Sequence, residues 1–493
     1  MRVWGSIGLV LGAPLLLAGA DGQHSELQER GQRPRHEHRQ RVSDDPNDWP
    51  QYNHDDRGSR FNSAEHLLRP RSVGELAIQW QYAAAGPVNA TPAVVNGRVY
   101  AGDATGLFHA VTDEGAPVWT AQLDGGVLSS ALVTNRFVFV GTGLGNFYAL
   151  GVDDGAVAWQ VRPDSHPVAS IQGSPLLVAN KVIVPMTTDE AFAAADPAYP
   201  CCTGRGSVAA FDPDTGALLW QKYTISDADA ANGSAGAGVW GTPTYDAETG
   251  VLYFGSGQNY VPPATSTSDS VFAVDVETGE TLWQTQVTEN DVWNFRLPPV
   301  GENKDGDFGD SPKLFRLRGG RKAIGIGQKT GTFWVFDAET GEPIASRELV
   351  PGGVLGGFQT GCAYANGLHF TNGVDWPDLF VDPANFRPPP TGGAVIALSA
   401  GLSREVWRFE TPGSPFISGV TVAGGVVYAV SSALGTLYAL RASDGRELAQ
   451  VQLGPTVSGP SVSRGRVYVG TGNLIIRSLP TNAVGTITAL GVP

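Results

Sequence analysis

The feature of this chain that most limits its fold is a hairpin motif that recurs from one end to the other. The clearest copy spans residues 206–220, where an alternating apolar run leads through an Asp-Thr-Gly turn into a strand ending in Trp220. Imperfect copies begin at Gly106, Gly145, Ser270, Gly331 and Gly435. Alternating apolar residues on both sides of a glycine turn are typical of a β-hairpin. The motif therefore predicts an all-β chain of repeated hairpins.

A second pair of strands precedes each hairpin, most clearly in residues 91–102 and 458–472. Each repeat is therefore expected to be a four-stranded antiparallel sheet. One small sheet cannot bury both of its faces, so such units stack around an axis, with the recurring aromatic residue packed between neighbours. This arrangement is a β-propeller.

Eight repeat units can be counted along the chain. They span roughly 91–123, 130–163, 173–225, 241–287, 311–349, 354–411, 419–453 and 458–479. The last unit lacks an outer strand ending in Trp, whereas Leu76–Trp80 is such a strand without a unit of its own. We predict an eight-bladed propeller in which this N-terminal strand completes the last blade, because closure removes the exposed sheet edges.

The spacing of the turn glycines locates the longest insertions. Gly115 and Gly155 are 40 residues apart, whereas the later intervals, from Gly155 to Gly341, measure 61 to 63 residues. The middle blades therefore carry extra loops. Insertions in repeat rings tend to gather on one face, which is where function is usually found.

The N-terminal region divides into two segments before the propeller, which is predicted to span residues 46–493. Residues 1–20 combine one Arg, an apolar stretch and a small-residue exit, which is typical of a cleavable signal peptide. Residues 21–45 hold five Arg and three His with few apolar residues, which favours a disordered polar leader. His36-Glu37-His38 could bind a metal, but a solvated tail explains this tripeptide better.

Charge and histidine placement limit the partners. The net charge is −15, without a basic stripe, which argues against nucleic acid or anionic membranes. No membrane span is expected. Five of the eight histidines lie at or before His66, and the other three have no metal-binding spacing. A histidine-based zinc or iron centre is therefore not expected.

The cysteines form an unusual set of three, of which Cys201 and Cys202 are adjacent. Two small buried residues side by side would be the simplest interpretation. In an exported protein with almost no other cysteine, however, the pair favours a vicinal disulfide. Cys362 is then expected to be a packed core thiol.

Several segments together resemble the pyrroloquinoline-quinone-dependent alcohol dehydrogenases, and most closely the polyvinyl-alcohol dehydrogenases. They are the opening stretch 48–67, Leu76–Trp80, the Asp-x-x-Thr-Gly-x-x-x-Trp repeats and Pro200–Gly206 with its Cys-Cys pair. The resemblance covers nearly the whole chain from Asp48. The Cys-Cys motif and its context are the specific part, since non-catalytic propellers share the blade repeat.

This resemblance implies a cofactor site. The quinone would lie flat between Trp240 and the disulfide of Cys201 and Cys202, and flat contacts suit a planar ring system. Arg205, beside the cysteine pair, joins the expected cofactor-binding residues. Lys329 would contact the quinone oxygens. Trp240 could instead be a core aromatic, and each of the others an ordinary loop residue.

The resemblance also implies a metal site and a catalytic base. Gln258 occupies the place of an amide that binds calcium beside the quinone. Asp291 would be both a calcium ligand and the general base. The family's calcium-binding Glu falls on Cys201 here, so Asp189, Glu190 or Asp196 could replace it. A divalent cation of this kind needs six or more oxygen ligands. The acidic run 305–310 is expected to be a structural loop entering the fifth blade.

The implied reaction is oxidation of an alcohol, with secondary or polymeric alcohols as candidates, to a carbonyl by hydride transfer to pyrroloquinoline quinone. Asp291 would take the hydroxyl proton, while the cation and Lys329 stabilise the negative charge that develops. No Cys-x-x-Cys-His motif occurs, so no covalently bound haem is expected in this chain. Electrons would therefore pass to a separate acceptor such as cytochrome c. The protein itself is expected in the periplasm or outside the cell. The alternative is a non-catalytic propeller serving as an envelope assembly scaffold or binding module.

Overall fold

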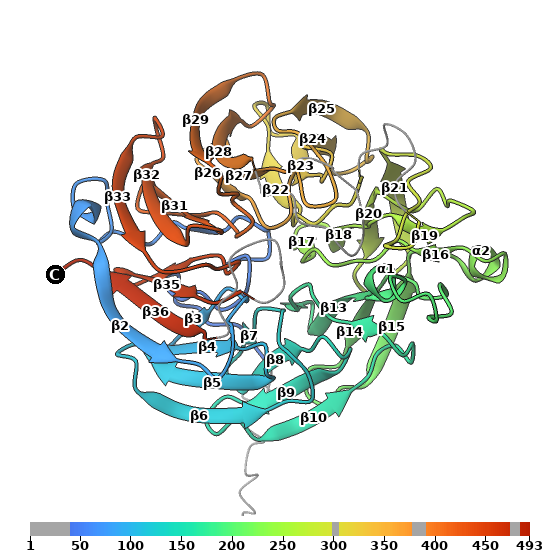
Figure 1. Cartoon of the computed structure of the whole chain (residues 1–493), viewed down its shortest axis with the longest axis horizontal. Helices are drawn as coiled ribbons and strands as arrows, with labels where there is room; N and C mark the ends of the chain where they lie inside the picture. The colour runs from blue at the N-terminus through green and yellow to red at the C-terminus, as the bar shows by residue number, and fades with distance from the viewer. Residues whose placement is uncertain (1–39, 298–304, 377–390, 474–483) are drawn as a thin grey trace, which may run out of the picture. The chain divides into compact units, whose positions relative to one another are not determined.

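A computed structural model describes residues 40–297, 305–376, 391–473 and 484–493 of the chain. Within residues 40–493, eight four-stranded antiparallel sheets are arranged in a ring (Figure 1). The predicted eight-bladed β-propeller is therefore confirmed. The predicted signal peptide, residues 1–20, and the tripeptide His36–His38 lie outside the described residues.

The blades follow one another along the chain, and each runs through its four strands in order. The first four blades are β3 to β6 (Ala93–Val95, Arg98–Gly102, Leu107–Thr112, Pro117–Gln122), β7 to β10 (Leu132–Val133, Phe137–Gly141, Phe147–Gly151, Val157–Val161), β12 to β15 (Leu176–Val178, Lys181–Thr188, Ser207–Phe211, Leu218–Tyr223) and β17, β18, β20 and β21 (Thr244–Asp246, Val251–Gly255, Ser270–Asp275, Thr281–Gln286). The next three are β22 to β25 (Lys313–Arg316, Lys322–Gly327, Thr332–Asp337, Pro343–Glu348), β26 to β29 (Ala363–Ala365, Leu368–Asp375, Gly392–Ser399, Glu405–Pro412) and β30 to β33 (Thr421–Ala423, Val426–Ser431, Thr436–Arg441, Glu447–Gln452).

The eighth blade closes the ring by joining the two ends of the described chain. It consists of β34 (Ser461–Ser463), β35 (Arg466–Gly470), β36 (Thr486–Gly491) and β2 (Ala77–Ala83), and Ala77 lies opposite Gly491. The predicted closure by the N-terminal strand is confirmed. The predicted end of the last unit at residue 479 is wrong, because β36 begins at Thr486. No Asp-Gly turn follows β36, so the hairpin motif that located the other blades is missing there.

Neighbouring blades are joined by the recurrent tryptophans. The indole Nε1 of Trp220 donates to the carbonyl of Val276 in the next blade at 3.0 Å, and its ring covers Gly279. Gly279 has a φ of +73°, and a Cβ there would lie 2.7 Å from the ring. The same contact joins Trp80 to Gly115, Trp119 to Gly155, Trp159 to Gly216, Trp283 to Gly341 and Trp407 to Gly445. Glycine is thus required at this turn both by φ and by the packed indole.

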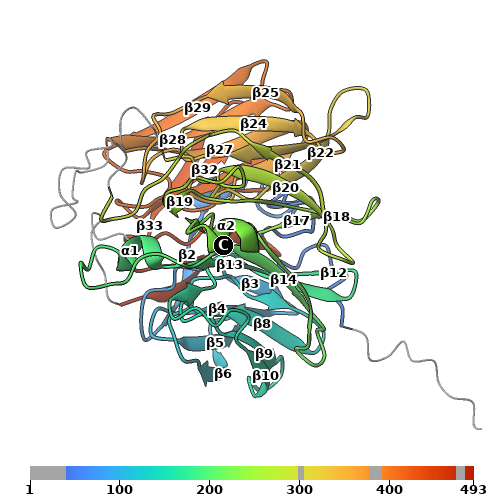
Figure 2. The same cartoon turned by 90° about the vertical axis from the view of Figure 1, so that its right-hand side faces the viewer.

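The connections that carry the insertions share one face of the ring. Because strands alternate in direction, the links between the second and third strands of a blade lie on the same side as the links from one blade to the next. Helix α1 (Glu190–Ala193), helix α2 (Asp227–Ala231) and strand β19 (Asn259–Val261) belong to such links. Figure 2 shows α1 and β19 toward one side of the ring. We call this side the insertion face.

Residues 40–45, which the sequence assigns to the polar leader, pack against the ring. Gln40 is buried, accepts a hydrogen bond from Thr134 and donates one to Asp214, and Val42 forms a β-bridge with Thr134. Polar side chains can be ordered when each finds a partner, which composition alone does not reveal. Among the described residues, no helix has the length and apolarity needed to cross a bilayer.

Candidate functional site

Most of the predicted site residues lie on consecutive connections of the insertion face. Cys201 and Cys202 lie between β13 and β14, and Trp240 lies between β15 and β17. Gln258 lies between β18 and β20, Asp291 between β21 and β22, and Lys329 between β23 and β24. The same connections also carry Asp269, after Gln258, and Asp305 and Asp307, after Asp291. Residues from three adjacent blades can therefore meet at one place.

Asp307 is the point at which these connections meet. Its carboxylate accepts hydrogen bonds from the indole Nε1 of Trp240 at 3.2 Å and from the backbone NH of Gln258 at 2.6 Å. The ammonium of Lys329 lies 3.4 Å from the same carboxylate. In the orientation that satisfies its hydrogen bonds, the Gln258 side-chain amide also donates to Asp307, at 3.0 Å. Asp307 thus binds three of the predicted site residues.

Three more carboxylates surround this point. Lys329 Nζ lies 2.6 Å from Asp305 Oδ2, and Asp291 Oδ2 accepts the backbone NH of Gly306 at 2.7 Å. Both oxygens of Asp269 are buried without a hydrogen-bond partner in the described structure, and a Cβ at Gly306 would lie 3.0 Å from its Cγ. Four acidic side chains, Asp269, Asp291, Asp305 and Asp307, are therefore buried around one ammonium group. We call these four residues and Lys329 the acidic cluster.

Burial controls the protonation of the acidic cluster. Burial raises the pKa of Asp291 to about 7, and the nearby Asp307 charge adds to this rise. Burial, followed by repulsion from neighbouring carboxylates, also raises the pKa values of Asp269 and Asp305 well above the usual range. Burial would lower the pKa of Lys329, but Asp305 and Asp307 raise it, so the ammonium stays charged. A carboxyl group with a pKa near 7 is suited to accept a proton at neutral pH.

Trp240 lies between the acidic cluster and the axis of the ring. Gly309 packs directly against its indole, where a Cβ would overlap the ring. Trp240 also borders an axial cavity of about 210 Å³. The cavity is lined by residues of the connections that lead into all eight blades, namely Thr91, Ser130, Gln172, Thr242, Gly309, Gln359, Ile417 and Gly459. Gln258, Asp291 and Lys329 do not line this cavity, so among the predicted site residues Trp240 is the one that borders both the acidic cluster and the axial space.

The cysteine pair is oxidised and held in place by a buried carboxylate. A disulfide joins Cys201 to Cys202. Glu190 is fully buried and accepts hydrogen bonds from the backbone NH groups of Thr203, at 3.0 Å, and Gly204, at 2.6 Å. Glu190, predicted as a possible calcium ligand, therefore binds the disulfide loop in this structure. Separately, Cys362 is a buried free thiol, as predicted.

Three other predicted residues have contacts outside the acidic cluster. The Arg205 guanidinium lies over the Tyr223 ring at 4.0 Å and pairs with the exposed Asp227 at 2.7 Å. Asp189 accepts a hydrogen bond from Gln172, and burial raises the pKa of Asp189 to about 6. Asp196 is exposed. The structure therefore brings together Trp240, Gln258, Asp291 and Lys329, but not these three.

The acidic cluster suits a hard cation by its chemistry. Hard divalent cations are bound by carboxylate and amide oxygens, and the cluster offers four carboxylates against one ammonium. The two orphaned oxygens of Asp269 are the clearest sign of a missing positive partner. Within the described ranges, no three His, Cys, Asp or Glu side chains are already arranged around a common metal position. The donors are present, but they do not form a complete coordination shell.

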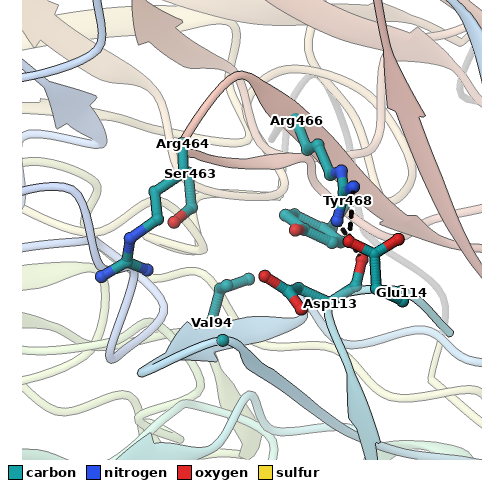
Figure 3. Close-up of a pocket in the computed structure, with 8 residues that line it drawn as sticks. Val94, Asp113, Glu114, Ser463, Arg464, Arg466 and Tyr468 are labelled. Carbon is teal, nitrogen blue, oxygen red and sulfur yellow. Dashed lines mark hydrogen bonds and ion pairs between the residues drawn. The ribbon is translucent and has the colours of Figure 1, made fainter. Parts of the chain in front are cut away.

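A second cavity, of about 190 Å³, lies where the eighth blade meets the first (Figure 3). Its arginines are already paired with carboxylates. Arg466 binds Glu114 at 2.9 Å, and Arg464 binds Asp45 at 2.7 Å and Asp48 at 2.5 Å. Hairpin turns on the side opposite the insertion face line this cavity, so it is separate from the acidic cluster.

Three members of the acidic cluster, Asp269, Asp305 and Asp307, are not among the site residues predicted from the sequence. The run 305–310 was expected to be only a structural loop, and it does lead into β22. Its Asp-x-Asp spacing was the available signal for an acidic site. Asp269 had no such signal, because its position depends on the loop between β18 and β20.

Comparison with known proteins gives a family and a fold. The model of a family described as outer membrane protein assembly factor BamB matches residues 77–290 and 391–485. A polyvinylalcohol dehydrogenase from a Pseudomonas species is 28% identical over 459 residues, covering 82% of this chain and 70% of that protein. The predicted resemblance to quinone-dependent alcohol dehydrogenases is thereby confirmed.

Solved structures share the ring. The quinohemoprotein alcohol dehydrogenase of Comamonas testosteroni matches 90% of this chain and 80% of its own, with a TM-score of 0.73 and 21% identity. BamB from Moraxella catarrhalis matches 84% of this chain and 99% of its own, with a TM-score of 0.57 and 16% identity. At these identities the two structures establish the fold and nothing further.

Proposed function

The chain belongs to the propeller family described as outer membrane protein assembly factor BamB, and from this premise we propose that it is an exported quinoprotein that oxidises an alcohol to a carbonyl. The proposal is supported by relatives that are alcohol dehydrogenases, such as the polyvinylalcohol dehydrogenase of Pseudomonas. A secondary or polymeric alcohol is the proposed substrate. The electrons would leave to a separate acceptor such as cytochrome c.

One observation carries this proposal. Trp240, Gln258 and Lys329 come from connections of different blades, yet all contact the carboxylate of Asp307. Asp291 lies beside them through Gly306. A propeller used only as a scaffold has no need to bury a proton acceptor, an ammonium and an indole together on its insertion face.

These residues fit pyrroloquinoline quinone and a cation. When bound, the quinone supplies the two-electron oxidation of the alcohol. Trp240 would hold a flat ring system, with the disulfide of Cys201 and Cys202 as its second wall. The Lys329 ammonium lies 5.8 Å from the centre of the Trp240 ring, where it can stabilise negative charge on a stacked ligand. Gln258 and Asp291 are the proposed ligands of a divalent cation, with calcium as the candidate.

Asp291 is the proposed general base. The backbone NH of Gly306 holds its Oδ2, so we assign Oδ1 as the atom that takes the hydroxyl proton. The acidic cluster is buried, which excludes bulk water and strengthens the electrostatic interactions within it. The basic form is available at neutral pH because the pKa of Asp291 is raised to about 7 rather than higher.

Dye-linked alcohol oxidation by the purified protein, with and without added quinone and calcium, tests the proposal. We expect alcohol-dependent dye reduction only when the quinone is present. Asp291→Asn should abolish turnover while an absorbance titration still shows quinone binding, because the amide keeps the shape and loses the base. Asp227→Asn, at an exposed carboxylate, is the control and should retain turnover. Full activity of Asp291→Asn would place the base elsewhere.

A non-catalytic assembly scaffold is the second candidate, since the description of the matching family favours it. Under this hypothesis the folded protein would neither bind quinone nor reduce dye. Deleting the gene in its host would instead lower the amount of outer-membrane proteins. Quinone binding with alcohol turnover, without any change in those proteins, would exclude the scaffold.

A further inference from the structure

An exposed aromatic pair lies on the insertion face. The side chain of Phe192, on α1, is 63% exposed, although large aromatic side chains are usually covered. Its ring is stacked on that of Phe295, with centroids 4.9 Å apart and planes inclined by 27°. Two stacked rings at the surface form a flat apolar platform, which we call the aromatic platform.

Backbone contacts fix this platform. The NH of Phe295 donates to the carbonyl of Ala191 in α1 at 3.0 Å. Arg296 reaches across the same loop and donates to the carbonyls of Ala194, Asp196 and Tyr199 at 2.7 to 3.1 Å. These bonds join the segment after Asp291 to the insertion that carries the disulfide. The two rings are therefore held in position rather than carried on a free loop.

The platform is continuous with the proposed site. The Phe295 ring packs edge-on against Trp293 at 5.7 Å, and the Trp293 ring lies 5.7 Å from Lys329 Nζ. The side chain of Asn294, between the two aromatic residues, lies 3.7 Å from the Cys201 sulfur. The aromatic contacts thus run from the exposed Phe192 to the ammonium of the acidic cluster.

We propose that Phe192 and Phe295 bind the carbon chain of the substrate, so that the enzyme favours a long or polymeric neutral alcohol over a short one. The inference rests on the proposed function and adds the residues that determine chain-length preference. Aromatic faces contact C–H groups over a large area, and a chain of alternating CH₂ and CHOH groups presents such a surface. The two platform rings carry no charge, so they suit an uncharged chain, and the neighbouring Arg296 directs its guanidinium to backbone carbonyls.

Phe192→Ala tests the inference, because an exposed side chain can be removed with little effect on folding. Propan-2-ol and polyvinyl alcohol would be compared as substrates of the quinone-loaded protein. We expect kcat/KM for the polymer to fall about ten-fold, mainly through KM, and kcat/KM for propan-2-ol to stay within about two-fold. Phe192→Trp should restore polymer oxidation, since it keeps a flat ring. Leu218→Ala is the matched control, because Leu218 is 52% exposed on β15 of the same blade.

A binding measurement separates this inference from the proposed function. The cofactor-free protein should be retarded in a native gel containing polyvinyl alcohol, and Phe192→Ala should lose most of this retardation while Leu218→Ala keeps it. If wild type oxidises propan-2-ol but Phe192→Ala and Leu218→Ala are indistinguishable on the polymer, the platform is excluded and the proposed function stands. If wild type oxidises no alcohol, the proposed function fails. Polymer binding by the platform is then decided by the gel, in which equal retardation of wild type and Phe192→Ala would exclude it. If Phe192→Ala slows only transfer to a protein electron acceptor, the surface serves that acceptor and the inference is wrong.

Discussion

At the scale of single residues, Lys329 is expected to contribute strongly to stability. Its ammonium is the positive group of the acidic cluster, 2.6 Å from Asp305 and 3.4 Å from Asp307. Lys329→Ala should therefore weaken quinone binding and turnover together and lower the free energy of unfolding by about 3–5 kcal/mol. Lys181→Ala, which breaks a pair with the exposed Glu277, should cost less than about 1 kcal/mol. Urea unfolding measures the free energy of unfolding of both variants. Equal losses would show that the acidic cluster does not need the Lys329 ammonium for stability.

Asp103 gives a second prediction at this scale, on acid stability. It is buried and receives hydrogen bonds from His109 and Thr105, which lower its pKa to about 2 although burial opposes them. The usual Asp pKa is near 4, so the stabilisation is complete above about pH 4 and is lost as the pH falls toward 2. Asp103→Asn should be less stable than wild type by about 2 kcal/mol at pH 7. This difference should shrink on acidification, and a constant difference from pH 7 to pH 2.5 would contradict the assignment.

Single residues also show how far local motifs can predict the site. Trp240, Gln258, Asp291 and Lys329 could be chosen from local motifs because each motif resembles a known segment. Asp269 and Asp307 become site residues only when separate connections fold together. The Asp-x-Asp spacing marks Asp307 as part of an acidic run, whereas nothing local distinguishes Asp269 from other loop aspartates. Arg205 is the opposite case. Its place beside the cysteine pair predicted a cofactor-binding residue, but its guanidinium lies over the Tyr223 ring instead.

At the scale of elements, the Trp and Gly joints between blades can be measured separately from turn strain. Gly279 and Gly250 both lie in turns of the fourth blade with φ of +73° and +74°. A Cβ at Gly279 would lie 2.7 Å from the Trp220 ring, whereas a Cβ at Gly250 would meet nothing within 4 Å. Gly250→Ala should therefore cost about 1–2 kcal/mol from the left-handed backbone alone. Gly279→Ala should cost about 1–3 kcal/mol more, because the indole must move.

Thermal or urea unfolding of the two variants measures that difference. Equal losses of stability would mean that the joint tolerates a methyl group and that the glycine serves the turn only.

The hairpins and their tryptophans were predictable because both strands and the turn are close in sequence. The position of strand β36 was predicted wrongly because no local turn motif marks it. Its pairing with β35 and β2 defines its place in the ring, and β2 lies some 400 residues before it in the sequence.

At the scale of the whole molecule, stability depends on closing the ring. Strand β36 pairs with β35 on one side and with β2 on the other, and β2 carries the Trp80 that packs on Gly115 of the first blade. Removing residues 486–493 therefore deletes one strand and leaves β2 without its partner. It also exposes the edge of β35, and exposed edges promote aggregation.

We expect this truncated protein to lose the wild-type unfolding transition and to scatter light at temperatures where wild type stays clear. Removal of Pro493 alone, outside the strand, should leave both properties unchanged. Circular dichroism melts with parallel light scattering make the comparison, and a truncated protein that melts like wild type would show that the ring does not need its closing strand.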